Sequence, residues 1–333
     1  MAEAQFRLIF QWSVAADGYT WLSTTPPGEQ KEGLFLSTAA PTGSPVRMRR
    51  YFPFEETGMF RDFAATSPDR ESIKAFADRY GLLGGATMGT LLPLPDRPRE
   101  NGFLTGSGER LSHWRHEIQR LRRSVELYDW TRADDLEALE RVVIWEDDRV
   151  SYQSHPDWSA GQEIPSDRPM TFSTIASRHI HDDRLQRFDH GDLIKPALFY
   201  IQKEINDRLD DETRLRLLWD PEESQLTNCA VPSSLLGAIW LQFALSVERG
   251  SSFRRCQECG KWFEVSPKAG RSDKLFCSTV CRVKAFRKRK ARVPVSLGAA
   301  EGIVEDTGPD SPPAPARKGS KSRKGRRPAG SGS

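Results

Sequence analysis

Four of the five cysteines in this 333-residue chain lie close together near its C-terminal end. They form two pairs with short spacings, Cys256 with Cys259 and Cys277 with Cys281. Pairs of thiolates at these spacings are typical of tetrahedral zinc sites, because each pair comes from one turn and the intervening segment lets the turns meet. The sequence therefore predicts a structural Zn²⁺ site with four cysteine ligands and no open position for a catalytic water.

A disulfide or redox pair is the alternative interpretation of such cysteines. The N-terminal segment MAEAQFRLIFQWS alternates like a strand and does not resemble a signal peptide. No apolar run approaches the ~18 residues of a membrane span. We therefore expect a cytoplasmic protein that does not contact membranes and keeps its thiols reduced. The fifth cysteine, Cys229, is expected to be a buried thiol.

The segment after the second pair predicts a basic helix. Ser278 is a suitable N-cap for a helix from about residue 279 to 292. Val280, Val283 and Phe286 recur at helical spacing, so we expect them to dock this helix on the metal knuckle. Trp262 is expected to pack within the knuckle. A module this small needs the metal for much of its folding energy.

Charge is distributed unevenly along the chain. Residues 251–293 contain 13 Lys and Arg against 3 Asp and Glu, a net charge of +10, and residues 294–333 add +3. Since the whole chain carries +3, residues 1–250 carry −10. The metal with its four thiolates would reduce the finger to about +8, which remains typical of a surface that binds phosphates. The residues expected to contact phosphates are Arg282, Lys284, Arg287, Lys288, Arg289 and Arg292.

This segment resembles bacterial zinc-ribbon modules that read C-x2-C…F…(F/Y)-C-S-x2-C-R-x-K-A-(F/Y)-R-x-R and, more distantly, CGNR zinc fingers. The match comprises Cys256, Cys259, Phe263, Phe276, Cys277, Ser278, Cys281, Arg282, Lys284, Ala285, Phe286, Arg287 and Arg289. Residues 51–84 also resemble the front of such bacterial proteins, which are largely uncharacterised. The chain differs from the CGNR pattern in having Arg282-Val283 after Cys281. The resemblance implies a DNA-binding regulator with a helical or mixed domain before the finger.

The body before the finger is predicted to be α+β and mainly helical. Residues 5–52 alternate as strands of a small antiparallel sheet. Helices are expected at 57–65, 69–80, 109–128, 134–141 and 193–209, and a strongly apolar one begins at Pro232 or Ser233. Short strands are expected at 142–144, 149–152, 214–219 and 225–230, whereas 84–108 is expected to be a loop. Arg120, Arg122 and Arg123 are expected on a solvated helix face.

These features predict three parts. Residues 1–250 form the body, as one domain or two subdomains, and residues 251–293 form the four-cysteine finger, of treble-clef or ribbon type. Residues 294–333, rich in Pro, Gly, Ser, Lys and Arg, form a disordered basic tail. The short Gly250-Ser251-Ser252 linker predicts a finger coupled closely to the body.

Three classes of function are compatible with this organisation. The one we favour is a zinc-dependent nucleic-acid-binding protein, with DNA favoured over RNA, acting in transcription regulation while the body binds an unknown ligand or protein. The second is a zinc-dependent protein-interaction adaptor. The third is an enzyme using the polar segment with His179, His181 and His190. We predict no enzyme, because the sequence has no recognisable phosphate loop or nucleophile motif, and we interpret those histidines, with His113 and His116, as loop or surface residues.

Overall fold

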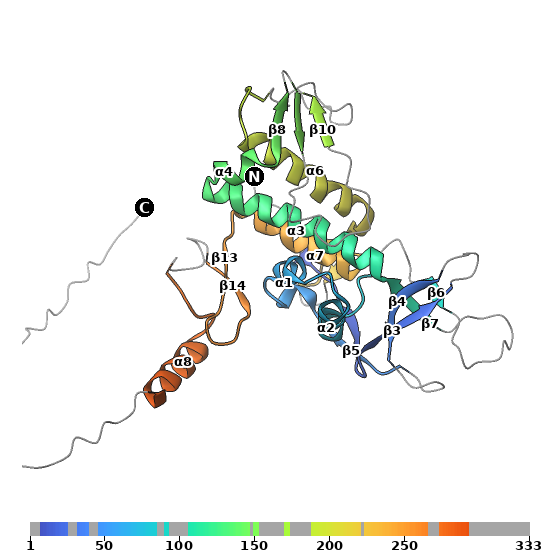
Figure 1. Cartoon of the computed structure of the whole chain (residues 1–333). Helices are drawn as coiled ribbons and strands as arrows, with labels where there is room; N and C mark the ends of the chain where they lie inside the picture. Colours follow the sequence, from blue (N-terminus) through green and yellow to red (C-terminus); the bar gives the residue numbers. More distant parts are fainter. Residues whose placement is uncertain are drawn as a thin grey trace, which may run out of the picture. The chain divides into compact units, whose positions relative to one another are not determined.

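The computed structural model describes residues 7–25, 32–39, 46–84, 90–92, 106–146, 149–152, 170–173, 188–220, 223–265 and 273–292 (Figure 1). The chain divides into one compact unit, Met1–Lys288, and a second unit, Arg289–Ser333. In the second unit only residues 289–292 are described, as the last turn of a helix. The predicted tail at 294–333 lies outside the described residues.

The described residues between 7 and 51 form strands, as the alternating pattern predicts. Two small antiparallel sheets result: β2 pairs with β5, and β3, β4, β7 and β6 follow one another in the second. The strands are β1 (Arg7–Leu8), β2 (Trp12–Ala15), β3 (Tyr19–Thr24), β4 (Gly33–Thr38), β5 (Met48–Tyr51), β6 (Thr90–Leu92) and β7 (Gly106–Arg110). The prediction of a loop over 84–108 is thus wrong for β6 and the start of β7, because their Thr- and Gly-rich sequences do not show the pairing partner that orders them.

Helix α1 (Met59–Ala65) and helix α2 (Arg70–Tyr80) confirm the next predictions. They follow a short 3₁₀ turn at Pro53–Glu55. The side chain of Asp69 caps α2 by accepting a hydrogen bond from the Ser72 N–H at 2.8 Å, and Gly81 follows its last residue with φ of 99°. Their apolar faces contribute Phe60, Phe63 and Phe76 to the core.

Three long helices, α3 (Leu111–Ala133), α6 (Ile194–Glu212) and α7 (Leu235–Glu248), pack against one another around the main core, and α1 packs on α3 and α7 (Figure 1). Helix α3 begins two residues later than predicted, because Glu109 belongs to β7 and accepts hydrogen bonds from the N–H groups of Leu83 and Gly84. Trp114 and Trp240 are fully buried at the centre.

The remaining elements of the body are short. Helix α4 (Leu136–Glu140) precedes a sheet of strands β8 (Val143–Glu146), β9 (Arg149–Tyr152) and β10 (Met170–Ser173). Strands β11 (Thr213–Asp220) and β12 (Gln225–Pro232) form an antiparallel hairpin. Strand β1 pairs with β12 in parallel and not with its sequence neighbours, so the order is β1-β12-β11. The finger follows as β13 (Phe253–Arg255), β14 (Trp262–Glu264) and α8 (Thr279–Arg292).

The arginines of α3 do not form a solvated face, contrary to the prediction. The Arg120 guanidinium donates to Glu204 of α6, and Arg208 of α6 donates to Glu117 of α3. Arg122 donates to the backbone oxygens of Ala64 at 2.7 Å and Thr66 at 2.6 Å. Glu117 and Glu204 are almost completely buried, so α3 and α6 are joined by two charged pairs largely removed from water.

Breaking one of these pairs should destabilise the body strongly. A Glu204→Leu change leaves the Arg120 charge in a desolvated position, and we expect the free energy of unfolding to fall by about 3 kcal/mol. The double change Arg120→Met with Glu204→Leu should recover most of that loss, because neither charge then remains. Urea unfolding followed by circular dichroism measures both.

Lys203→Ala provides the control. Lys203 lies next to Glu204 in sequence and pairs with Asp207 at 2.6 Å, but both side chains are more than two-fifths exposed. This change should cost no more than about 0.5 kcal/mol. Equal losses for Lys203→Ala and Glu204→Leu would contradict the assignment of the buried pair.

Candidate metal centre

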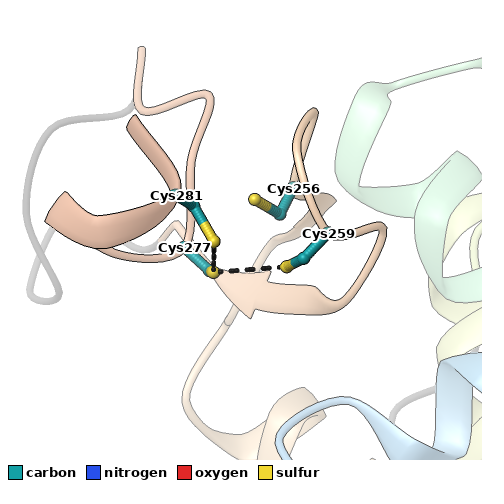
Figure 2. Close-up of side chains that lie close together, drawn as sticks. All are labelled: Cys256, Cys259, Cys277 and Cys281. Carbon is teal, nitrogen blue, oxygen red and sulfur yellow. Dashed lines mark hydrogen bonds between the residues drawn. The ribbon is translucent and has the colours of Figure 1, made fainter. Parts of the chain in front are cut away.

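The first cysteine pair lies on the turn that joins β13 to β14. The Cys256 N–H donates to the Lys261 oxygen at 2.9 Å, and the Gly260 N–H donates to the Cys256 oxygen at 2.9 Å. Gly260 has φ of 72°, a conformation that favours glycine. These bonds close a tight knuckle and bring Cys256 and Cys259 to one side of it (Figure 2).

The second pair lies at the beginning of α8. The hydroxyl oxygen of Ser278 accepts a hydrogen bond from the Cys281 N–H at 3.2 Å, which confirms the predicted cap. Cys277 precedes the helix and Cys281 lies in its first turn. Both side chains therefore point toward the knuckle (Figure 2).

The four sulfur atoms form one cluster. All lie within 4.8 Å of one another, and Cys277 is 3.6 Å from Cys259 and 3.5 Å from Cys281 (Figure 2). A tetrahedral ion with bonds of about 2.3 Å to sulfur requires separations near 3.8 Å. The cluster therefore fits a metal ion with four thiolate ligands. Among the described residues it is the one group of potential ligands arranged in this way. Cys229 is buried in β12, away from the cluster, as predicted.

The protonation of the thiols is consistent with a metal site. Burial opposes ionisation of Cys256, but backbone N–H groups of Cys277, Cys259 and Glu258 stabilise its thiolate and lower its pKa to about 6. Burial and hydrogen bonds with neighbouring thiols raise the pKa of Cys277 to about 12. Without a cation, the Cys277 thiol thus resists ionisation beside its neighbouring sulfurs, and a bound ion would offset this cost.

The finger has little apolar core of its own. Its buried side chains are Cys256, Phe263 and Val265, with Phe276 packed beside them. This small cluster cannot order the segment alone, so the metal and the body must contribute.

The body contacts the finger through Arg61 of α1. Its guanidinium lies 5.4 Å from the ring centre of Phe253 and 5.6 Å from that of Trp262. It also donates to both carboxylate oxygens of Asp129 on α3, at 2.6 and 2.7 Å. Trp262 thus packs against the body as well as within the finger. The contact agrees with the close coupling predicted from the short linker.

The structure separates the predicted phosphate-binding residues into two groups. Lys288 pairs with Glu258 of the knuckle at 2.6 Å, and Lys284 approaches the same carboxylate at 3.9 Å. Arg282, Arg287 and Arg289 are exposed, and the side chain of Arg292 lies outside the described side chains. Glu258 and Arg61 were not singled out by sequence analysis. The position of Glu258 between two ligands, as an acid in a basic segment, is the signal that was available.

The apolar stripe of α8 does not dock on the knuckle, contrary to the prediction. Val280, Val283 and Phe286 are exposed by 75, 40 and 60%. The reason is geometric: Cys281 must face the other sulfurs, and residues at 280, 283 and 286 then lie on other sides of the helix. Ala285, one turn after Cys281, is half-buried instead.

The histidines do not form a second site in the described residues. His179 and His181 lie outside them. The His190 ring lies tilted beside the Trp145 ring with centroids 5.1 Å apart, and the Asp192 carboxylate accepts from the N–H groups of Ile194 and Lys195 at the start of α6. His113 is not a surface residue as predicted: it is partly buried, and burial lowers its pKa.

Comparison with known proteins gives no relative: no family model, curated protein or solved structure matches the chain. Among the described helices, none combines the length and apolar character needed to cross a bilayer.

The cluster should bind one metal ion per chain. Elemental analysis of the purified chain should give a ratio near one. Cys281→Ser should lose most of the metal, since a hydroxyl is a poor ligand beside three thiolates. Cys229→Ser is the matched control and should retain it. A Cys281→Ser variant with full metal content would contradict a four-cysteine site.

Arg61 should hold the finger against the body without affecting metal binding. Arg61→Met removes its contacts with Phe253, Trp262 and Asp129, worth about 1–2 kcal/mol. Amide hydrogen exchange in β13 and β14 should become about tenfold faster. Metal content should be unchanged. Arg61→Lys should behave similarly, because an ammonium lacks the planar fork. Unaltered exchange in both variants would show that Arg61 does not position the finger.

Proposed function

We propose that the ion is Zn²⁺ and that residues 251–293 are a treble-clef-like zinc finger which binds nucleic acid. Four thiolates in a closed arrangement are the usual ligands of structural zinc. A hairpin whose turn carries one ligand pair, followed by a helix whose start carries the other, is compatible with such a finger. The supporting observation is the cysteine cluster at the start of α8.

The basic helix carries the proposed contacts. The metal fixes the first turn of α8, and Arg282 and Arg287 project to solvent from the helix while Lys284 and Lys288 neutralise Glu258. Arginines are well suited to phosphates because the guanidinium offers a planar fork of donors. We therefore assign the phosphate contacts first to the exposed arginines and only secondarily to the two lysines.

The proposed biological role is that of a DNA-binding transcriptional regulator. It rests on the resemblance of residues 256–289 to bacterial zinc-ribbon and CGNR-like modules. The acidic body would then bind a ligand or a partner protein. No catalytic role is proposed for either part.

Neighbouring cations on different sides of α8 provide the test. Arg287→Gln and Lys288→Gln each remove one positive charge from adjacent positions. Binding of random duplex DNA to the zinc-loaded full chain is measured by fluorescence anisotropy across salt concentrations. Arg287→Gln should reduce the slope of log K against log salt by about 0.9, the effect of one phosphate contact. Lys288→Gln should change the slope much less, because Glu258 already pairs with that lysine.

A Cys277→Ser/Cys281→Ser variant completes the experiment. Loss of salt-dependent binding in this variant would support a contact organised by the metal. Unchanged binding would indicate that the basic tail makes the DNA contact. Absence of binding in every protein, including the parent, would refute the nucleic-acid proposal. Single-stranded RNA in the same assay distinguishes the two polymers.

A second function is favoured by one specific observation. Val280 and Phe286 of α8 are mostly exposed beside the basic residues, and an apolar side chain on a solvated helix suits a protein partner. In this alternative the finger is a zinc-dependent adaptor. Val280→Ser with Phe286→Ser should leave DNA binding intact if the nucleic-acid proposal is correct, since neither residue donates to phosphate. Loss of an affinity-captured protein in this variant, with no DNA binding by the parent, would favour the adaptor.

A further inference from the structure

The hairpin of β11 and β12 exposes more apolar side chain than any other described strand pair. Leu215, Leu217 and Trp219 of β11 are exposed by 68, 58 and 61%. Leu226, which lies opposite Trp219 on β12, is exposed by 59%. Scattered single leucines are ordinary on protein surfaces, but a contiguous apolar group indicates a surface that is covered by something else.

Strand β11 is also an edge. In the sheet order β1-β12-β11 its only strand neighbour among the described residues is β12. An edge strand leaves alternate backbone N–H and C=O groups available for pairing, and natural edges are usually blocked by proline, lysine or a bulge. The segment TRLRLLWD contains no proline, lysine or glycine. Its two arginines, Arg214 and Arg216, lie with Leu218 on the opposite face from Leu215 and Leu217, because successive side chains alternate.

We propose that β11 pairs antiparallel with β11 of a second copy of this chain, which joins the two sheets into one. A two-fold axis perpendicular to the sheet relates the strands, so each face of one copy continues into the same face of the other. Main-chain hydrogen bonds would hold the strands together, and the exposed leucines would cover one another across the new boundary.

The sequence of β11 selects one register. Centring the axis on Leu217 places Leu217 opposite its own copy and Leu215 opposite Trp219 of the second copy. On the other face it places Arg214 opposite Asp220, the carboxylate that also pairs with Arg7, and Arg216 opposite Leu218. On the first face apolar residues thus meet apolar ones, and on the second one cation meets an acid while the aliphatic stem of the other lies beside a leucine.

Neighbouring registers are worse. Because residues directly opposite each other must share a face, the axis can pass only through a residue. Centring it on Arg216 brings two guanidinium groups together, which is unfavourable. Centring it on Leu218 leaves Thr213, Arg214 and Leu215 beyond the end of the partner strand, so that only residues 216–220 pair, whereas the axis at Leu217 pairs residues 214–220. The sequence of β11 is thus complementary to itself about Leu217. We therefore choose a second copy of the chain as the partner of β11, because a strand that pairs with an unrelated strand does not have to match its own sequence. The inference does not depend on nucleic-acid binding.

The oligomeric state tests the proposal directly. Light scattering after size-exclusion chromatography should give twice the mass of one chain for the parent protein. Leu217→Lys places two like charges at the axis and should give a monomer with an unchanged circular dichroism spectrum. Leu226→Lys is the control: it removes an equally exposed leucine from the same face, but on the inner strand, and should remain dimeric. A monomeric parent, or a monomeric Leu226→Lys variant beside a dimeric Leu217→Lys, would overturn the proposal.

A cysteine scan tests the register independently of stability. Opposite Cα atoms in an antiparallel pair lie about 4.5–5.5 Å apart, within the range that a disulfide spans. Leu217→Cys in the metal-loaded full chain should therefore form a covalent dimer on mild oxidation. Leu215→Cys should not, because the two copies of position 215 lie about 13 Å apart along the strands. Cross-linking of Leu215→Cys but not Leu217→Cys, or of neither, would contradict the assigned pairing.

Discussion

The guanidinium of Arg61 is the contact on which the relation between body and finger depends. It lies against aromatic rings of β13 and β14 and pairs with Asp129 of α3, so one side chain connects the helical core with both strands of the finger. The arginine is 8% exposed, whereas its acidic partner is 47% exposed. This arrangement keeps the desolvation cost moderate, because Asp129 retains water while the flat, weakly hydrated cation packs between rings. The finger's own buried cluster is small, so contacts with the body must help to order it. Besides Arg61 these include Phe60, whose ring lies edge-on to that of Phe253 with centroids 5.2 Å apart.

Much of the body could be predicted from local patterns. Helices α2, α3, α6 and α7 follow from apolar residues at helical spacing, and the Asp69 cap and Gly81 end follow from residues adjacent to the pattern. The failures concern long-range partners. A row of arginines on α3 has the composition of a solvated face, and nothing within that helix shows that α6 presents Glu204 to it. Similarly, β1 pairs with β12 more than two hundred residues later, and no local pattern specifies that partner.

The site divides in the same way. The cysteine spacing was sufficient to predict the cluster, because ligand geometry is a short-range constraint that the sequence states directly. The orientation of α8 was not predictable from its apolar stripe, because the position required of the Cys281 sulfur determines which face of the helix turns toward the knuckle. The stripe at 280, 283 and 286 lies on other faces and is exposed. The pairing of Lys288 with Glu258 was missed for a related reason. The net charge of the basic segment does not show that Lys284 and Lys288, on one face of the helix, lie beside an acid of the same finger, Glu258.

Gly58, which precedes α1, limits how this finger could be exchanged for another. A Cβ atom on Gly58 would lie 2.5 Å from the Cβ of Trp262, and Gly58 has φ of 76°. Since every residue except glycine has a Cβ, trimming the indole at 262 would not create the missing space. The two parts are therefore fitted at the level of the backbone. A body with any other residue at position 58 would have to displace either α1 or β14 to accept this finger. Gly58 is therefore part of the surface on which the finger packs, as well as the residue that precedes α1.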